Sequence, residues 1–123
     1  MEANSSASKR QKTEEHKAMH SSVLLPGKPL SFTVLKTFNR CRASVMTLKH
    51  GSVRTPVYMP VGTKGAMKGI TSQVMDKEID CDIMLANTYH LFLKPGEEIL
   101  HKNGGVHNFM DWNRCLLTDS GGF

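Results

Sequence analysis

The sequence has few cysteines, and no two of them form a C-x-x-C pair. Its three cysteines, Cys41, Cys81 and Cys115, are far apart and odd in number. This spacing encodes neither a zinc knuckle nor a disulfide framework. The six histidines also lack the spacing of metal ligands. We therefore expect no metal site within this chain, a reducing compartment and a cytoplasmic location.

Long hydrophobic runs are absent as well. No apolar stretch approaches the ~20 residues that cross a bilayer, so we expect no membrane-spanning segment. The first 22 residues contain no Ile, Leu, Val, Phe, Tyr or Trp and are rich in Ser, Lys and Glu. Such a composition cannot form a packed core. We predict a disordered polar tail over residues 1–28 and a folded domain over residues 29–123.

Acidic residues are outnumbered, 11 against 16 lysines and arginines, which leaves a net charge of +5. Dividing the chain at Pro29 leaves +2 on the tail and +3 on the remainder, so the basic excess is expected to be spread along the chain. A positive charge of this size is compatible with a nucleic-acid partner. It is equally compatible with an ordinary basic protein.

The first part of the predicted domain has the pattern of antiparallel strands. Apolar and polar residues alternate over 30–34, which predicts a half-buried strand. Two further apolar runs, 45–49 and 53–58, flank His50-Gly51-Ser52 and predict a hairpin. Pro56 lies within the second run, and proline in a sheet is confined to edges and strand starts. This run is therefore expected to be an edge strand or the start of a new one.

After the hairpin, strand and helix patterns alternate. Short apolar runs at 57–61, 83–86 and 116–118 predict three strands. Between them, a cap at Thr71 or Ser72 predicts a helix with Val74, Met75 and Ile79 on one face. A second helix is predicted over 97–102, after Pro95-Gly96. Strands separated by helices favour parallel pairing, so the expected fold class is α/β.

Polar or glycine-rich residues follow each predicted parallel strand: Gly62-Thr63, Asn87-Thr88 and Asp119-Ser120. Ligands of parallel α/β folds bind at the carboxyl ends of the strands, so these ends predict one composite site. The last five residues, Asp119-Ser120-Gly121-Gly122-Phe123, suit a flat heterocycle, with a carboxylate, a hydroxyl, exposed backbone N–H groups and an aromatic face. From the residues alone, a turn-initiating Asp119 is an equally good interpretation.

Ordered motifs through this region resemble one known family. The following segments occur in order: Thr55-Pro56-Val57-Tyr58-Met59-Pro60-Val61-Gly62-Thr63, Lys68-Gly69, Asn87-Thr88-Tyr89-His90-Leu91, Pro95-Gly96, Gly104-Gly105-Val106-His107, Phe109-Met110-x-Trp112 and Leu117-Thr118-Asp119-Ser120-Gly121-Gly122-Phe123. Together they resemble the N-terminal part of tRNA-guanine transglycosylases over about residues 32–123. Within that family the chain looks most like the catalytic, queuine-inserting subunit of eukaryotes.

The resemblance implies a fold and a reaction. It implies the N-terminal portion of an irregular (β/α)8 TIM barrel, incomplete in this chain and preceded by an antiparallel hairpin. The family exchanges guanine for queuine, or for a 7-deazaguanine precursor, at the anticodon wobble position of tRNA. One aspartate of the family attacks the ribose and holds the tRNA as a covalent intermediate. A second aspartate, matching Asp119, contacts the bases and accepts a proton.

Other residues acquire roles from the same resemblance. It implies that Ser120, Gly121 and Gly122 help to hold the base and that Phe123 stacks on it. Three residues are expected near the ribose and the nucleophilic aspartate: Val61, Leu85 and Asn87. Apart from the resemblance, Tyr89 and His90 are expected to be core residues rather than catalytic ones, and Phe109 and Trp112 are expected to be packing residues. The chain departs from the family at Asp80-Cys81-Asp82, where a turn that usually contains glycine is one residue longer.

The resemblance also places much of the machinery beyond this sequence. The nucleophile, the Cys/His zinc site and most of the barrel are expected downstream of Phe123, so no cofactor is expected within the chain. The implied partners are the anticodon loop of tRNA, guanine or queuine, and an accessory subunit in a heterodimer. Two hypotheses remain. The chain is a piece of the transglycosylase, or it is a catalytically dead truncated product that acts at most as a subunit-binding module.

Overall fold

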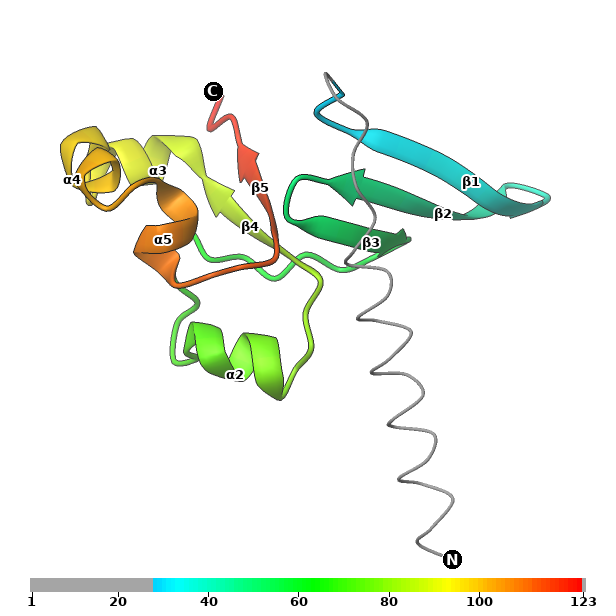
Figure 1. Ribbon diagram of the computed structural model, residues 1–123, viewed down its shortest axis with the longest axis horizontal. Coiled ribbons are helices and arrows are strands. Elements are labelled where there is room, and N and C mark those ends of the chain that lie inside the picture. Colours follow the sequence, from blue (N-terminus) through cyan, green and yellow to red (C-terminus); the bar gives the residue numbers. More distant parts are fainter. Residues whose placement is uncertain (1–27, 123) are drawn as a thin grey trace, which may run out of the picture. The chain divides into compact units, whose positions relative to one another are not determined.

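The structure is a computed structural model that describes residues 28–122. Almost all of the predicted polar tail, and Phe123, lie outside the described residues. The chain divides into two compact units, residues 1–56 and residues 57–123. The segment 29–123, predicted as one domain, therefore falls into two units, and each is described by itself. Element labels follow Figure 1.

The first unit contains a three-stranded antiparallel sheet in the order β1-β2-β3 (Figure 1). The strands are β1 (Ser31–Phe38), β2 (Cys41–Leu48) and β3 (Gly51–Thr55). The register pairs Leu48 with Gly51, so the predicted hairpin is confirmed. β3 ends at Thr55, immediately before Pro56, and lies at an edge of the sheet. The proline could not have donated a ladder hydrogen bond there, which is why the strand stops.

The half-buried character predicted for residues 30–34 is wrong. β1 exists, but nearly all of its residues are exposed, including Phe32 at 44% and Phe38 at 73%. Burial within this sheet falls on the other two strands, at Ser44, Ser52 and Val53. Alternation of apolar and polar residues predicts a pleated strand, but it does not show whether another element packs against one face of that strand.

The second unit contains the parallel pair β4 (Ile83–Asn87) and β5 (Cys115–Asp119), which lie side by side in Figure 1. Parallel pairing was predicted and is confirmed. The strand predicted over 57–61 is reduced to a single parallel bridge between Val61 and Leu85. This part of the chain is mixed α/β, as expected.

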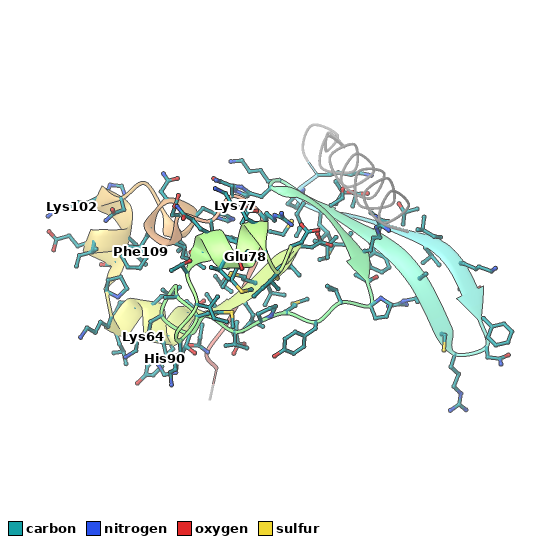
Figure 2. The ribbon with its side chains drawn as sticks, turned by 90° about the horizontal axis from the view of Figure 1, so that it is seen from below. Lys64, Lys77, Glu78, His90, Lys102 and Phe109 are labelled. Atoms are coloured by element: carbon teal, nitrogen blue, oxygen red, sulfur yellow. The ribbon has the colours of Figure 1, made fainter. Side chains whose placement is uncertain are left out.

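Four short helices accompany these strands: α2 (Ser72–Lys77), α3 (Thr88–Leu93), α4 (Glu97–Lys102) and α5 (Val106–Met110). The predicted helix over 97–102 matches α4, and the Thr71 hydroxyl caps α2 by accepting a hydrogen bond from the N–H of Val74. Ile79 is not on this helix, which ends before it, and its side chain is 50% exposed. Helices α3 and α5 were not predicted from the sequence. Figure 2 shows Lys77 and Lys102 at the ends of α2 and α4.

The core of the second unit lies between its helices and strands. Its buried members are Met75, Cys81, Met84, Met110 and Trp112. Trp112 is 1% exposed, and its indole N–H donates to the carbonyl of Cys115 over 2.9 Å. A buried indole needs such an acceptor. Trp112 and the partly buried Phe109, which packs against this core, are therefore packing residues, as predicted.

The two units differ in charge. Residues 28–56 contain six basic residues and no Asp or Glu, whereas residues 57–122 contain six basic and eight acidic residues. The expectation that the basic excess is spread along the chain was an effect of dividing the sequence at Pro29, and it is wrong. Within residues 28–122, no helix is long and apolar enough to cross a membrane.

Candidate functional site

The carboxyl ends of β4 and β5 bring two polar side chains together. The parallel register places Asn87 directly opposite Asp119. The side-chain amide of Asn87 donates from Nδ2 to Oδ2 of Asp119 over 3.1 Å. Asn87 is half-buried and Asp119 is exposed. The predicted meeting of these two strand ends is therefore present in the fold.

Asn87 also caps the next helix. Its Oδ1 accepts a hydrogen bond from the N–H of His90 over 3.1 Å, at the start of α3. An amide offers an acceptor on one side and two donors on the other. Because the helix N–H requires the oxygen, the NH2 group must face the carboxylate. The helix cap thus orients Asn87 as a donor to Asp119.

Val61 lies beside Leu85, because the two residues form a parallel β-bridge. The N–H of Leu85 donates to the carbonyl of Pro60 over 2.9 Å, and the N–H of Gly62 donates to the carbonyl of Leu85 over 2.7 Å. On its other side Leu85 pairs with Leu117. Val61 is 51% exposed. The three predicted strand ends are therefore adjacent at one edge of this unit.

The residues after β5 approach the start of α3 closely. Gly121 has a φ of 66°, in the left-handed region that favours glycine. A Cβ at this position would lie 2.5 Å from the Cβ of Tyr89. The N–H of Gly122 donates to the Ser120 hydroxyl over 3.3 Å. Phe123, to which the resemblance gives the stacking role, lies outside the described residues.

Tyr89 is more exposed than its sequence context predicts. It was expected to be a core residue, but its side chain is 44% exposed. It contacts the position of Gly121, and its ring lies edge-on to the ring of His90, 5.5 Å between centroids. The available signal was its place two residues after a strand end, which is where site residues of parallel folds gather. His90 itself is half-buried.

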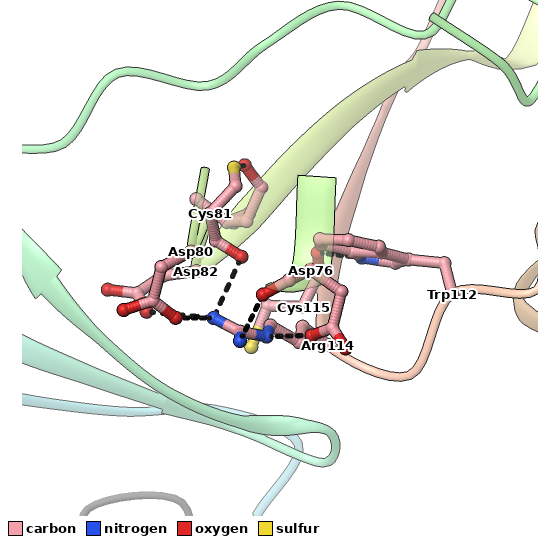
Figure 3. Close-up of polar contacts among 8 residues, drawn as sticks. Asp76, Asp80, Cys81, Asp82, Trp112, Arg114 and Cys115 are labelled. Atoms are coloured by element: carbon pink, nitrogen blue, oxygen red, sulfur yellow. Dashed lines mark hydrogen bonds and ion pairs between the residues drawn. The ribbon is translucent and has the colours of Figure 1, made fainter. Parts of the chain in front are cut away.

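A second polar cluster lies at the other end of these strands, around Arg114, which directly precedes β5 (Figure 3). Its Nε donates to Oδ1 of Asp76 over 2.6 Å, and Nη1 donates to Oδ1 of Asp80 over 2.7 Å. Two backbone carbonyls, those of Asp76 and Cys81, complete the set. The residues of the long turn, Asp80-Cys81-Asp82, thus hold Arg114, and Asp80 itself has a φ of 57°.

Burial and charge shift the pKa of groups in this cluster. Burial lowers the pKa of Arg114, but the hydrogen bonds that Arg114 donates to the carboxylates of Asp80 and Asp76 outweigh it, and the net pKa is raised. Burial, with a smaller contribution from the charge of Asp82, raises the pKa of the Cys115 thiol to about 11. Arg114 therefore remains positively charged, and its hydrogen bonds connect the start of β5 to α2 and to the turn before β4. The cluster is structural and lies away from Asp119.

The described residues do not offer a metal centre. Across residues 28–122, no three His, Cys, Asp or Glu side chains are placed to hold a metal ion. The side chains at the strand ends, an amide and a carboxylate, are suited to hydrogen bonding with a polar ring. Asp119 can accept a proton or an N–H hydrogen bond, and Asn87 fixes one of its two oxygens.

Comparison with known proteins identifies one family of relatives. Residues 38–123 match the family model described as queuine tRNA-ribosyltransferase. A queuine tRNA-ribosyltransferase of Janthinobacterium sp. (strain Marseille) is 50% identical over 94 residues, which are 76% of this chain and 25% of that protein. The protein of the same name from Thermotoga maritima is 52% identical over 94 residues, with the same shares. The chain spans about a quarter of the length of these relatives.

Proposed function

Because this chain belongs to the queuine tRNA-ribosyltransferase family, we propose that the protein it represents exchanges guanine for queuine at the wobble position of tRNA. The observation that carries the proposal is the Asn87–Asp119 pair at the carboxyl ends of two parallel strands. A base bound at this edge meets an oriented carboxylate. The polar edge of a guanine or deazaguanine ring offers the N–H donors that such a carboxylate accepts.

Base exchange requires one bond to break and an equivalent bond to form. In the proposed reaction, a carboxylate attacks C1′ of the ribose while the bond from C1′ to N9 of guanine breaks, and guanine leaves with a proton. The incoming base then loses its ring proton and displaces the carboxylate from C1′. Two carboxylates share such work in retaining glycosidases, one as nucleophile and the other handling protons. We assign the proton-handling role to Asp119 and the nucleophilic role to an aspartate that follows Phe123.

The geometry around Asp119 suits proton handling. Asn87 donates to Oδ2 and thereby holds the carboxylate in one orientation. Among the described residues Oδ1 accepts no hydrogen bond, so it is the oxygen assigned to the ring N–H. We further propose that Val61 and Leu85 border the ribose, and that Ser120, Gly122 and Phe123 complete the base site. Gly121 contributes by letting this segment pass close to Tyr89.

The remaining proposals follow from the family. We propose that the second unit forms the first part of an irregular (β/α)8 barrel, that the protein works in the cytoplasm, and that it pairs with an accessory subunit. The zinc implied for the family finds no ligand set in residues 28–122. No step of the proposed reaction is therefore assigned to zinc here.

The test is incorporation of radiolabelled guanine into tRNA by a full-length protein carrying this segment. Asp119→Asn keeps the shape of the side chain but cannot accept a proton, so we expect exchange to fall below about 1% of the unmodified rate. Asp111→Asn makes the same chemical change at an exposed residue whose φ of 51° asparagine adopts readily. This control should exchange normally. Normal exchange by Asp119→Asn would reject the assigned role.

The 123-residue chain should be assayed beside the full-length protein. Within residues 28–122, Asp119 has no second carboxylate in contact with it, and we expect the short chain to be inactive. Exchange by the short chain would mean that the nucleophile lies within it.

A further inference from the structure

The three-stranded sheet of the first unit carries charge of only one sign. Six basic residues and no acidic residue occur between residues 28 and 56. All six are exposed: Lys28, Lys36, Arg40, Arg42, Lys49 and Arg54. None of them forms an ion pair with a carboxylate of the described residues. Six like charges on about thirty residues repel one another, and a bound anion would relieve this repulsion.

The strand register shows which of these residues share a face. Arg54 pairs with Val45, and Lys36 pairs with Ala43. Paired residues point to the same side, and positions two apart along a strand do so as well. Val45 and Ala43 are two apart on β2, so Arg54 and Lys36 lie on one face. Side chains stand out from this sheet on both faces (Figure 2).

An aromatic side chain accompanies the charges on that face. Phe38 pairs with Cys41, which is two residues from Ala43, so it lies on the same side as Lys36. Phe38 is 73% exposed. Arg40 is an exposed cation two residues along the chain from Phe38, in the turn that joins β1 and β2. We call Lys36, Phe38 and Arg54, together with Arg40 in the adjoining turn, the basic sheet face.

We propose that the basic sheet face binds the phosphate backbone of RNA. Lysine and arginine neutralise phosphates, and an exposed aromatic ring offers a surface on which an unpaired base stacks. Charge complementarity with a polyanion explains why the sheet has no carboxylate. The inference rests on the proposed function in one respect, because the RNA bound here would be the tRNA substrate.

An opposite-face contact supports the same chemistry. The guanidinium carbon of Arg42 lies 5.4 Å from the centroid of the Phe32 ring. Such stacking spreads the guanidinium flat over an apolar surface while leaving its N–H groups available to phosphate oxygens. Arg42 is not part of the basic sheet face and is left unchanged in the test below.

The experiment measures binding of fluorescently labelled tRNA by the 123-residue chain from 50 to 200 mM salt. The triple variant Lys36→Gln, Arg40→Gln, Arg54→Gln removes three charges from the basic sheet face. The control Lys77→Gln, Lys94→Gln, Lys102→Gln removes three exposed charges from the second unit. Both variants have the same net charge and should show the circular dichroism spectrum of the unmodified chain.

Each phosphate contact contributes about 0.7 to 0.9 to the slope of log affinity against log salt. We expect the sheet variant to lose about 2 from this slope and the control to keep it. Over a fourfold change in salt, a slope difference of 2 corresponds to about 16-fold in affinity. Phe38→Ala should weaken binding roughly tenfold at every salt concentration without changing the slope. If the triple variant misfolds, the three substitutions can be tested one at a time, and each single variant should lose about 0.7 from the slope.

Equal slopes for the two triple variants would overturn the proposal. It would also be overturned if the sheet variant lost binding to vesicles of equal phosphatidylserine and phosphatidylcholine but kept its affinity for tRNA. In the full-length protein, we expect the sheet variant to raise KM for tRNA and leave kcat unchanged. If the full-length protein exchanged no guanine but the sheet variant still lost about 2 from the salt slope, the proposed function would be rejected and the RNA surface would stand. If the full-length protein exchanged guanine normally and the sheet variant kept its slope, the RNA surface would be rejected and the proposed function would stand.

Discussion

The side-chain amide of Asn87 joins a helix cap to a carboxylate, because it accepts from the N–H of His90 and donates to Asp119, both over 3.1 Å. Each contact constrains the other. The cap fixes which side of the amide is the acceptor, and the donor side then holds Asp119. Asn87 is therefore a positioning residue that acts through Asp119.

Two substitutions separate these contacts. Serine is as good an N-cap as asparagine but is too short to reach the carboxylate across the strand pair. Asn87→Ser should therefore keep the free energy of unfolding and lower kcat for guanine exchange. Asn87→Ala should lower kcat equally and cost about 1 kcal/mol of stability as well. Urea titration and steady-state exchange measure the two effects.

A control for this pair is Asn103→Ala. Asn103 donates to the carbonyl of Ile99 within α4 and makes no contact with the site. It should leave kcat unchanged. If Asn87→Ser exchanged at the unmodified rate, the hydrogen bond to Asp119 would have no role in positioning it.

Gly121→Ala tests the close approach after β5. A methyl group at Gly121 would meet Tyr89 at 2.5 Å, and the left-handed backbone adds about 1 kcal/mol of strain. We expect residues 120–122 to move away from α3 and KM for guanine to rise at least tenfold.

Gly69→Ala is the matched control for this change. Gly69 has a φ of 77°, so alanine meets the same left-handed strain there, but its Cβ would meet no atom within 4 Å. KM for guanine should stay within about twofold, because Gly69 is not part of the proposed base site. A normal KM for Gly121→Ala would show that the segment does not need its place against Tyr89.

Arg114→Lys tests the cluster at the opposite strand end. The Arg114 side chain is 17% exposed and donates through Nε, Nη1 and Nη2. A lysine ammonium cannot reproduce that fork. We expect a loss of about 1–3 kcal/mol in the free energy of unfolding, because hydrogen bonds to charged groups have this magnitude. Below the unfolding temperature, kcat should not change, since Asp119 lies at the far end of β5.

Lys102→Gln is the control for a salt bridge that should contribute little. Its pair with Glu98 spans 2.8 Å, but the two side chains are 70% and 80% exposed. Pairs of this kind contribute at most about 1 kcal/mol. If Arg114→Lys and Lys102→Gln lowered the free energy of unfolding equally, the multiple contacts of Arg114 would stabilise the fold no more than one exposed salt bridge does.

The sequence predicted where helices and strands begin and end better than it predicted which strand faces are covered by other parts of the molecule. Thr71 as a cap, Gly104-Gly105 after α4 and Pro56 after β3 are local signals, and the structure has the corresponding boundaries. The exposure of β1 depends on what packs against it, and alternation within residues 30–34 contains no such information. Helix α3 was missed because it is only six residues long and its cap is a strand residue, Asn87.

The candidate site was predictable in part for the same reason. Parallel strands that end in polar residues must bring those residues together, so Asn87 and Asp119 could be paired from the sequence. For Tyr89 the sequence offered only one signal, its place two residues after a strand end, because its exposure follows from the turn of α3. The partners of Arg114 lie 33–38 residues away along the chain, and no periodicity connects them.

Alkaline pH should destabilise the second unit through its buried thiols. Burial, with some help from the charge of Asp82, raises the pKa of Cys115 to about 11, from about 9 in the unfolded chain. Burial also raises the pKa of Cys81. A thiol with a raised pKa binds its proton more tightly in the folded state, so its contribution to stability is complete below pH 9. That contribution is lost as the pH rises from 9 to 11.

Cys115→Ala should flatten this fall in the free energy of unfolding, measured by urea titration from pH 9 to 11. Cys41→Ala, at an exposed site, should leave the fall unchanged. A fall of equal steepness in both variants would show that the Cys115 thiol is not its source.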